Sequence, residues 1–404
     1  MTRSASLAGS ALLALLVAGA AHPQGKAYGP GVTDTDITIG ETMPYSGPAS
    51  AYSTCGIAHQ RFFQALNDRG GVNGRKIRLI SLDDGMVPAR TVEQVRRLVE
   101  HEQVLLLFGI LGPGGLSVLD YADRKQVPFL FPSGAALQFH MPARHPWTMG
   151  WVPTFEFEGR VYGRYILRNR PDARIGVLWE DDDMGREQVA GLRKELGDKA
   201  DRMLVGVESY LLTDPTVDSQ IIALKSRGAD TIVNLATPKF GALAIRKVHD
   251  LGWKPLHILT YTAASVGATL KPAGLEKSVG LVSAYFGKSP TNPAVQNEPD
   301  VQEYLAWKAR YYPEGDVNDG CIDYAYMQAH LLVAVLKQAG NDLSRENVMR
   351  QARNLKGVRI PLLLPEITID TSPTDYRPIE SMRYMRFNGR GWEYFGEVMT
   401  ESAR

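Results

Sequence analysis

The sequence predicts an α/β protein whose sheets are mainly parallel and covered by helices on both faces. From Asp36 onward, short runs of β-branched or apolar residues alternate with longer stretches in which apolar residues recur at helical spacing. Glycine, asparagine and proline stand at many of the junctions. Steady alternation of strand and helix is typical of parallel sheets, and 404 residues are enough for two domains.

Eight short runs are expected to be strands. In chain order they are Ile37–Gly40, Ile77–Leu82, Val104–Phe108, Val127–Phe131, Ile175–Trp179, Met203–Glu208, Thr231–Leu235 and His257–Tyr261. Residues 140–153 separate the first four from the last four and show no clear period, so they are a candidate passage between two blocks. The pattern loosens again at 278–299, and after Pro361 it changes to short strands with turns, as at 387–389.

Three stretches show the helical spacing most clearly. Their apolar positions are Ala58, Phe62, Ala65 and Leu66; Val92, Val95 and Val99; and Ile322, Tyr326, Ala329, Val333 and Leu336. Residues 67–71, Asn-Asp-Arg-Gly-Gly, end the first of these helices with residues that tolerate positive φ, and Leu251-Gly252 ends a later helix in the same way. Pro88 and Pro215 are expected in first helical turns, which tolerate a missing N–H.

Residues 1–27 are expected to be a signal peptide and the start of the mature chain. A single Arg3 precedes an apolar stretch centred on residues 11–17, and the small residues 18–20 fit a cleavage site. A plain membrane anchor is the alternative, but about 18 apolar residues are needed to span a bilayer and this run is shorter. We therefore expect a soluble mature protein outside the cytoplasm that begins between residues 21 and 27.

Composition excludes one class of partner. Lys and Arg total 45 against 44 Asp and Glu, with no long run of either sign, so the basic footprint of a nucleic-acid-binding protein is missing. Small molecules or proteins are the expected partners.

The two cysteines, Cys55 and Cys321, are far apart in the sequence, and neither belongs to a metal-type CxxC pair. An oxidising compartment permits a disulfide between them. A disulfide and two separate buried thiols are both open before a fold is assigned.

Two loops have compositions that suggest ions or cofactors. The glycine-rich loop 109–115 follows an expected strand, but it lacks dinucleotide-binding spacing and the Gly-Lys-Ser/Thr ending, so it offers backbone contacts to an anion at most. Residues 316–319 hint at a calcium loop, but Gly320 stands where a ligand is needed and no glutamate follows at the right distance. We interpret that loop as a capped helix start and expect no cofactor.

The sequence contains no clear catalytic constellation, and we do not expect an enzyme. His140 and His145 have no acidic or thiol companion nearby, so we interpret them as solvated loop residues and expect no metal site. There is no GxSxG elbow, and Ser133 has no base nearby in the sequence. Asp183 is expected to cap the helix after its strand, and a contact with a ligand cation is the alternative for residues 181–183.

Small or hydroxyl-bearing residues follow the carboxyl ends of several expected strands. They are Ser46-Gly47 with Tyr52, Gly112–Gly115, Ser133–Ala135, Asp183, Thr237 and Tyr261-Thr262. Ligands of parallel α/β proteins lie at this edge of the sheet, where helix N-termini offer unpaired N–H groups. Two such blocks facing one another would form a cleft lined by tyrosines and backbone donors.

Six segments, taken in order, resemble the extracellular solute-binding receptors of the leucine/isoleucine/valine-binding type, which are the capture proteins of ABC importers. The segments are ITIGETMPYSGPASAY, FFQALNDRGGVNGRKIRLISLDD, PARTVEQVRRLV, VPFLFPSGAA, DPTVDSQIIALKSRGADTIV and AIRKVHDLGWKP. The likeness covers nearly all of the mature chain, and the run from Asn67 to Ile77 is specific to the group.

This resemblance implies two doubly wound parallel-sheet lobes joined by a three-segment hinge, with a ligand cleft between them. We place the crossings near Gly150, Ser283 and Pro361. The expected domains are residues 28–150 plus 284–360 for lobe 1 and residues 151–283 plus 361–404 for lobe 2. The resemblance also implies a monomeric periplasmic receptor whose partners are the membrane permease and ATPase subunits of an ABC importer.

The resemblance implies a set of ligand-binding residues as well. In the family, the loop after the first strand contributes an aromatic side chain, here matched by Tyr52, and the loop after the fourth strand, here 133–135, supplies donors for a carboxylate. The candidate ligand-binding residues are Tyr52, Leu111, Gly112, Ser133, Gly134, Ala135, Trp151, Asp183, Thr237, Tyr261 and Asp319. Because Tyr52 and Asp319 would face the cleft from the same lobe, a Cys55–Cys321 disulfide is also implied.

Three positions depart from the amino-acid binders of the family. Those proteins tend to have a hydroxyl residue where Ala135 stands, another near Pro113, and an acid near Tyr261 for the ligand's ammonium group. A buried ammonium group without such an acid lacks its partner. An aromatic or apolar carboxylic acid is therefore a serious candidate, and the segments WTMGW and TSPTDYRPIE resemble receptors for such acids. Residues 181–183 could replace the missing acid, which keeps branched-chain and hydrophobic amino acids open.

Two other functions are also open. A ligand-sensing receptor domain of the same fold would need an attached signalling segment, and this chain ends soon after Phe395. An exported hydrolase would need a nucleophile and a base, for which the sequence offers no clear pair.

Overall fold

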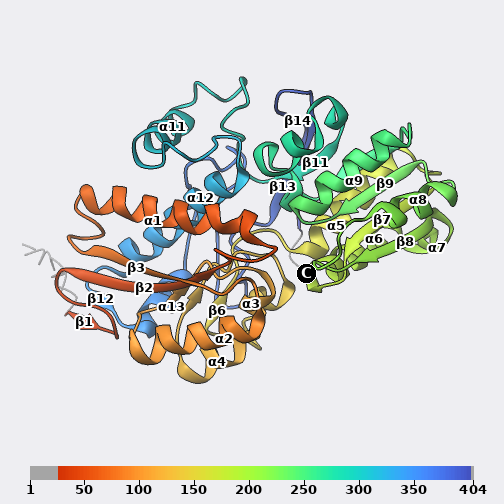
Figure 1. Cartoon of the computed structure of the whole chain (residues 1–404). Helices are drawn as coiled ribbons and strands as arrows, with labels where there is room; N and C mark the ends of the chain where they lie inside the picture. Colours follow the sequence, from red (N-terminus) through yellow and green to blue (C-terminus); the bar gives the residue numbers. More distant parts are fainter. Residues whose placement is uncertain (1–25, 402–404) are drawn as a thin grey trace, which may run out of the picture.

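The protein consists of two lobes, each built on its own sheet (Figure 1). The structure is a computed structural model that describes residues 26–401. The expected signal peptide therefore lies outside the described residues, apart from the last two positions of the 1–27 segment. The two-lobed α/β fold with mainly parallel sheets is confirmed.

Lobe 1 contains a five-stranded parallel sheet in the order β3-β2-β4-β5-β6. Its strands are β2 (Asp36–Met43), β3 (Lys76–Asp83), β4 (Leu107–Phe108), β5 (Phe129–Leu130) and β6 (Thr148–Met149). The longest pairing joins β2 to β3 from Asp36 opposite Lys76 to Met43 opposite Asp83. A short parallel pair, β1 (Ala27–Tyr28) with β12 (Asp342–Leu343), lies beside this sheet.

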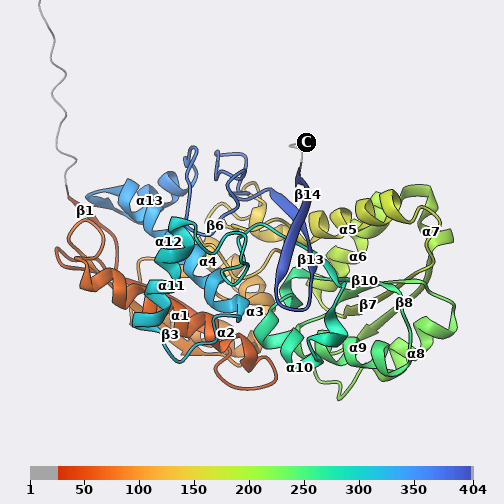
Figure 2. The same ribbon diagram turned by 90° about the horizontal axis from the view of Figure 1, so that it is seen from above.

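Helices cover both faces of the lobe 1 sheet (Figures 1 and 2). They are α1 (Ser53–Asp68), α2 (Pro88–Arg96), α3 (Gly112–Ser117), α4 (Leu119–Lys125), α11 (Pro299–Tyr311), α12 (Gly320–Ala339) and α13 (Arg345–Ala352). Helix α12 packs along α1 although the two are far apart in the sequence. The late part of the chain therefore returns to complete lobe 1.

Lobe 2 contains a seven-stranded sheet in the order β14-β13-β11-β10-β9-β7-β8. Its strands are β7 (Ile175–Glu180), β8 (Leu204–Tyr210), β9 (Thr231–Leu235), β10 (Leu256–Leu259), β11 (Val282–Tyr285), β13 (Ser381–Phe387) and β14 (Trp392–Thr400). The first five of these strands are parallel, and the hairpin β13–β14 adds antiparallel strands at the edge.

The helices of lobe 2 are α5 (Phe155–Asn169), α6 (Asp183–Leu196), α7 (Ala200–Met203), α8 (Asp218–Ser226), α9 (Pro238–Asp250) and α10 (Lys271–Ala273). Helices α5 and α6 pack closely because glycines stand at their contact. A Cβ atom on Gly191 of α6 would lie only 1.9 Å from the carbonyl oxygen of Glu156 on α5. Only glycine fits at this crossing.

All eight expected strands are present, as β2, β3, β4, β5, β7, β8, β9 and β10. Strands β6 and β11 were not foreseen, because each lies in a stretch without a clear sequence period. Helix α1 ends at Asp68, followed by Gly70 and Gly71 with φ of 97° and 72°, as expected. Pro215, in contrast, does not begin a helix: it lies in the turn before α8, which starts at Asp218.

The segments that connect the lobes run close together. The N–H of Ile379 donates to the carbonyl of Trp151, and the N–H of Leu364 donates to that of Phe286. The N–H of Thr371, however, donates to the carbonyl of Leu355 in lobe 1. The chain thus still contacts lobe 1 ten residues after Pro361. The boundaries near 150, 283 and 361 stay predictions.

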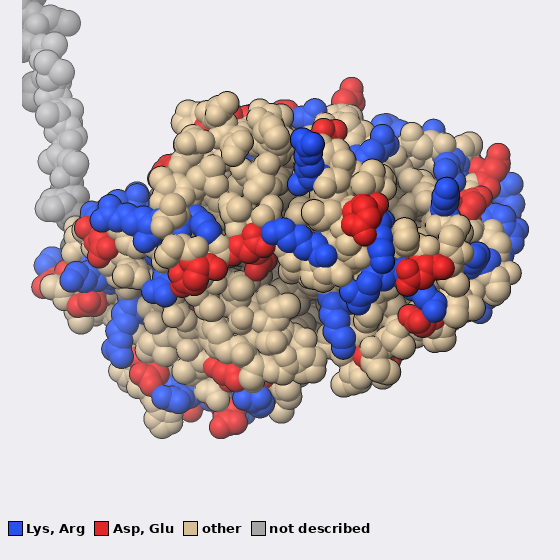
Figure 3. Space-filling view, turned by 45° about the horizontal axis from the view of Figure 1, so that its top comes forward, with Lys and Arg blue, Asp and Glu red and all other residues tan. Residues whose placement is uncertain are grey.

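The surface carries both charges without a dominant sign on the face in Figure 3, where basic and acidic side chains are interspersed. This matches the balance of 45 basic and 44 acidic residues. Within residues 26–401, no helix combines the length and the apolar character needed to cross a membrane.

Candidate ligand-binding cleft

A cavity of about 180 Å³ lies between the lobes, at the carboxyl ends of strands from both sheets. Residues after β4 and β5 line it from lobe 1, and residues after β7, β9 and β10 line it from lobe 2. The expected residues that line it are Tyr52, Leu111, Gly112, Ser133, Gly134, Asp183, Thr237, Tyr261 and Asp319. Their part in binding stays a prediction. Ala135 and Trp151 do not line the cavity.

Tyr52 belongs to a single helical turn directly before α1, and its side chain lines the cavity. Burial raises the pKa of Tyr52 well above its ordinary value, and Glu180 and Asp182 of lobe 2 act in the same direction. Tyr45, in the same loop, instead forms a hydrogen bond with Ser81 inside lobe 1. Of these two rings, Tyr52 is the one placed to meet a ligand.

Three backbone N–H groups of the loops expected to receive a carboxylate already donate hydrogen bonds within lobe 1. Gly112 donates to the carbonyl of Ser133, Ser133 donates to that of Ile110, and Gly134 donates to that of Pro132. The loops after β4 and β5 lie side by side, so they satisfy each other's backbone groups. These three donors are therefore not free for a ligand in this structure.

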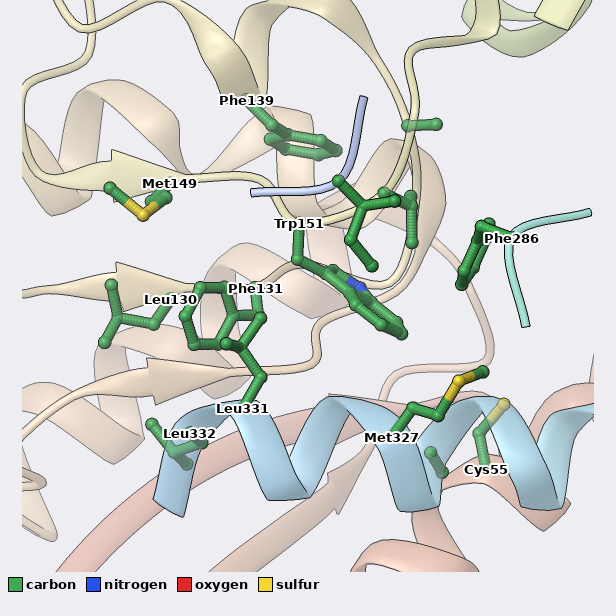
Figure 4. Packing of buried hydrophobic residues seen from close by; sticks show 14 of the residues in the cluster. Cys55, Leu130, Phe131, Phe139, Met149, Trp151, Phe286, Met327, Leu331 and Leu332 are labelled. Carbon is green, nitrogen blue, oxygen red and sulfur yellow. The ribbon is translucent and has the colours of Figure 1, made fainter. Parts of the chain in front are cut away.

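Ala135 and Trp151 support the cavity from behind. The carbonyl of Ala135 accepts a hydrogen bond from the N–H of Phe155, and Ala135 is fully buried. The Trp151 indole lies against Phe286 (Figure 4). It also donates to the hydroxyl of Tyr324 at 3.1 Å. Tyr324 does line the cavity, so Trp151 holds a lining ring in place.

The residue that caps α6 is Asp182, not the expected Asp183. The side chain of Asp182 accepts a hydrogen bond from the N–H of Gly185 at 2.9 Å, because Asp182 has the extended backbone of an N-cap while Asp183 is already helical. Burial raises the pKa of Asp182 to about 7. Asp183 lines the cavity and lies 3.7 Å from the guanidinium of Arg186.

An acid does stand near Tyr261 in space, although none does in the sequence. Glu158 of α5 accepts hydrogen bonds from the backbone N–H of Tyr261 at 2.9 Å and from the hydroxyl of Thr260 at 2.8 Å. Glu158 is fully buried, and burial raises its pKa above the ordinary value. Because Glu158 is not among the lining residues, it positions the Tyr261 loop and does not reach the cavity.

Sequence reasoning missed several residues of the cavity wall, among them Met184, Tyr285, Asp323, Tyr324, Met385, Trp392 and Tyr394. For Asp323 a signal existed: this acid stands within the apolar, buried face of α12, next to Ile322. Trp392 and Tyr394 come from the β13–β14 hairpin. No local pattern could have predicted that this hairpin reaches the cleft.

The lining is acidic. Asp182, Asp183, Asp319 and Asp323 are its ionisable acids, and none of the described residues that line it is Lys, Arg or His. Tyrosine, tryptophan, methionine and other apolar side chains make up much of the remaining wall. The cavity therefore offers carboxyl groups and ring surfaces to a ligand.

A disulfide joins Cys55 of α1 to Cys321 of α12 in the structure, with the Cα atoms 4.9 Å apart. This is the pairing that the resemblance implied. Asp319 caps α12 by accepting from the N–H of Cys321 at 3.0 Å, and Asp316 pairs with Lys271 at 2.8 Å. The acids of the supposed calcium loop thus have a capping and an ion-pairing role.

The two loop histidines are buried, contrary to the expectation of solvated side chains. His140 Nδ1 bonds the carbonyl of Tyr376 at 3.0 Å, and burial lowers the pKa of His140 to about 4. His145 Nδ1 lies 2.8 Å from the carboxylate of Asp123. Asp120 is close enough to complete a metal-like group with this pair, but hydrogen bonding accounts for the arrangement.

A family model described as periplasmic binding protein matches residues 36–391 of the chain. Among curated proteins, Leu/Ile/Val-binding protein homolog 7 of Brucella abortus (strain 2308) is 24% identical over 290 residues, which cover 68% of this chain and 71% of that protein. The homolog 8 protein of the same strain is 21% identical over 291 residues, covering 68% and 70%.

Two solved structures share the fold closely. A branched-chain amino acid ABC transporter protein from Thermus thermophilus with bound valine has a TM-score of 0.82 at 15% identity, covering 92% of this chain and 98% of that chain. A fatty acid ABC transporter substrate-binding protein from Thermomonospora curvata has a TM-score of 0.77 at 20% identity, covering 94% and 96%. At these identities the likeness shows the fold alone.

Proposed function

The chain belongs to the periplasmic binding protein family, and from this premise we propose that it is the substrate-binding protein of an ABC importer, which captures a small solute by closing its lobes. The observation that supports this most directly is the cavity lined from both lobes. A ligand that touches both lobes favours the closed form by its difference in affinity for the two forms. Moving a closed population from 1% to 99% takes about 5.5 kcal/mol of such difference.

Contacts across the cleft define the form that a ligand would stabilise. The N–H of Gly267 donates to the carbonyl of Asn318 at 2.7 Å, and the N–H of Gly320 donates to the hydroxyl of Ser265 at 3.1 Å. These bonds join the lobe 2 turn 265–270 to the start of α12 in lobe 1. The Lys271–Asp316 ion pair and the Leu137–Glu187 hydrogen bonds also join the lobes, and opening would break all of these contacts.

The proposed solute class is a hydrophobic or branched-chain amino acid, or an aromatic or apolar carboxylic acid. A cavity of about 150 Å³ with apolar walls accommodates benzene, so the cavity of about 180 Å³ here has room for one ring or one branched chain. The names of the two structural neighbours mention a bound valine and a fatty acid, and both of these are acids with an apolar tail.

We propose that the protein acts as a periplasmic monomer, exported by its N-terminal segment, and that permease and ATPase subunits recognise its closed form. We propose no catalysis. Ser133 Oγ, the hydroxyl considered as a nucleophile, pairs with Gln328, which lies between it and His59. A base is therefore not in contact with this hydroxyl.

Closure can be tested by small-angle X-ray scattering combined with a thermal-shift screen of amino acids and carboxylic acids. A ligand that raises the melting temperature should also reduce the radius of gyration. Gly320→Trp should abolish the reduction, because a Cβ atom on Gly320 would lie 3.6 Å from Cβ of Ser265 in the opposite lobe. Leu211→Trp adds the same ring at an exposed site and serves as the control. Ligand binding without any compaction would contradict the proposal.

A further inference from the structure

Asp323 is a buried carboxyl group in the cavity wall, and one of its oxygens lacks a partner. The residue is 6% exposed, and its Oδ1 accepts no hydrogen bond from any described residue. It stands in the first turn of α12, where the helix dipole favours negative charge. A buried ionised carboxylate without a cation is costly. Asp323 therefore lacks a partner that the described side chains could have supplied.

The groups that face Asp323 supply no positive charge. Asp319 approaches from the start of the same helix, Tyr304 from α11, Tyr285 from β11 and Tyr394 from β14. Burial raises the pKa of Asp323 well above its ordinary value, and the charge of Asp319 adds to this, while backbone amides of the helix start oppose it. Every neighbouring ionisable side chain is thus an acid or a phenol.

Gly320 leaves space beside this carboxyl group. A Cβ atom at Gly320 would lie 3.8 Å from Asp323 Oδ1 and 3.6 Å from Cβ of Ser265 in lobe 2. Gly320, Ser265 and Asp323 all line the cavity, although the unpaired Oδ1 atom is itself buried in this structure. A ligand in the cavity therefore lies beside Asp323.

The rest of the cavity favours a cation over an anion. Asp182, Asp183 and Asp319 add to the negative potential, and the described lining contains no Lys, Arg or His. The backbone N–H groups of Gly112, Ser133 and Gly134 are already used within lobe 1. A plain carboxylate would meet repulsion here, whereas a protonated nitrogen would meet an acid and the ring surfaces of tyrosines, which attract cations.

We propose that the solute carries a protonated nitrogen and that Asp323 binds this nitrogen, with Tyr285 and Tyr394 beside it. This inference rests on the proposed function and narrows its ligand class. Hydrophobic amino acids and amines with an apolar tail are ligands, and carboxylic acids without nitrogen are not. The acid that pairs with the ligand's nitrogen would then belong to α12 of lobe 1. Residues 181–183, which the sequence suggested for this role, belong to lobe 2.

Two matched sets of probes test the inference by calorimetry. One set is leucine, 4-methylpentanoate and 3-methylbutylamine; the other is phenylalanine, 3-phenylpropanoate and phenethylamine. Each set keeps the tail and removes either the nitrogen or the carboxylate. The probes with nitrogen should bind at least tenfold more tightly than the acid of the same set. Tight binding of an acid with compaction of the protein would overturn the inference and leave the proposed function standing, whereas binding of no probe would overturn the proposed ligand class itself.

Asp323→Asn tests the residue directly. It should weaken the nitrogen-bearing probes at least tenfold and leave the melting temperature of the ligand-free protein unchanged or higher, since it replaces a buried carboxyl group that lacks a charged partner with a neutral amide. Asp120→Asn removes the same charge from the exposed surface of α4 and should change nothing. Unchanged affinity in a folded Asp323→Asn protein would overturn the assignment.

The pH dependence of the unmodified protein gives a test that needs no variant. Because the free Asp323 carboxyl has a raised pKa, it must lose a proton to bind a cation, so affinity for 3-methylbutylamine should rise as the pH rises from 5.5 to 8.5. A neutral Asp323 that donates to a ligand carboxylate would give the opposite slope for the acids. Burial also raises the pKa of Asp182, in the same cavity, to about 7. The change of affinity with pH should therefore be compared between the unmodified protein and Asp323→Asn, and the difference between the two is the contribution of Asp323.

Discussion

Leu137 of lobe 1 and Glu187 of lobe 2 join the lobes across the cleft: the backbone N–H of Leu137 donates to both carboxylate oxygens of Glu187, at 3.1 and 3.0 Å. This contact lies on α6, whose first turn also provides the cavity residue Asp183. Burial between the lobes raises the pKa of Glu187 to about 7. Closing and proton binding are therefore linked.

The first prediction concerns pH and closure. In the open form Glu187 is solvated, and its pKa should be near the ordinary value of about 4.3, whereas the closed form raises it. The closed form thus binds the proton more tightly, so the contribution of Glu187 to closure is present below the lower pKa and is lost as the pH rises through about 7. The closed fraction of the ligand-free protein should fall severalfold between pH 5 and pH 8, measured by the distance between probes on the two lobes.

Glu187→Gln is the control for this prediction. The amide keeps an acceptor for the Leu137 N–H and cannot ionise, so the closed fraction should vary less with pH than in the unmodified protein. An identical pH profile in the two proteins would show that other groups, such as Asp182, govern closure.

The disulfide should stabilise lobe 1. Cys55 and Cys321 are 266 residues apart in the sequence, and their bridge fixes α1 to α12. Cross-links of this kind typically contribute about 2–4 kcal/mol. The double variant Cys55→Ser, Cys321→Ser should lower the free energy of unfolding by that amount in urea titrations. Reductant should reproduce the loss in the unmodified protein and have no effect on the variant; two free thiols in unreduced, denatured protein would refute the bridge.

The α5–α6 contact should be intolerant of any side chain. Gly191→Ala would bring a Cβ atom within 1.9 Å of the backbone oxygen of Glu156, which cannot move without displacing a helix. Overpacking of this kind costs about 1–3 kcal/mol or more, and the loss should be visible as a lower denaturation midpoint. Gly320→Ala is a matched helix control because its nearest contact would be an ordinary 3.6 Å. Equal midpoints for both variants would contradict the predicted packing.

The ring of Tyr52 should contribute to affinity, and the hydroxyl of Tyr45 should not. Tyr52→Ala removes a ring from the cavity wall and should weaken the tightest-binding probe roughly tenfold, since aromatic contacts contribute about 0.5–1.5 kcal/mol beyond their buried area. Tyr45→Phe removes only a hydroxyl bonded to Ser81 inside lobe 1. Calorimetry on both variants measures the difference, and a larger effect at Tyr45 than at Tyr52 would show that the cleft has been misplaced.

The fold was predictable where a local pattern was strong. Buried parallel strands such as Thr231–Leu235 are continuous apolar runs, and the helix that contains Phe62 repeats its apolar residues at 3.6 spacing. Strand β6 has two residues and β11 has four, so neither produced a recognisable period. Pro215 shows the limit of single-residue signals, because a proline fits a turn before a helix as well as its first turn.

The candidate site was predictable only in part. Strand ends placed Thr237 and Tyr261 near one another because carboxyl ends of parallel strands meet at one edge of a sheet, and they placed Ser133 at the corresponding edge of the other sheet. The sequence could not show that backbone amides of the loops after β4 and β5 are bonded within lobe 1. It also could not show that the hairpin bearing Trp392 reaches the cleft. Both depend on contacts between segments that are distant in the chain.

The sequence by itself determined the alternation of strands and helices and the loops that end at the cleft, because these follow from periodicity and turn chemistry within short windows. The family followed from the resemblance of six segments to known receptors. Only the tertiary structure decided the charge of the cleft. Asp182 and Asp323 are 141 residues apart in the numbering, and they line one cavity because α12 returns to lobe 1 while α6 belongs to lobe 2. The burial of these two acids and the absence of a cation among the described lining residues result from the packing of the two lobes against each other.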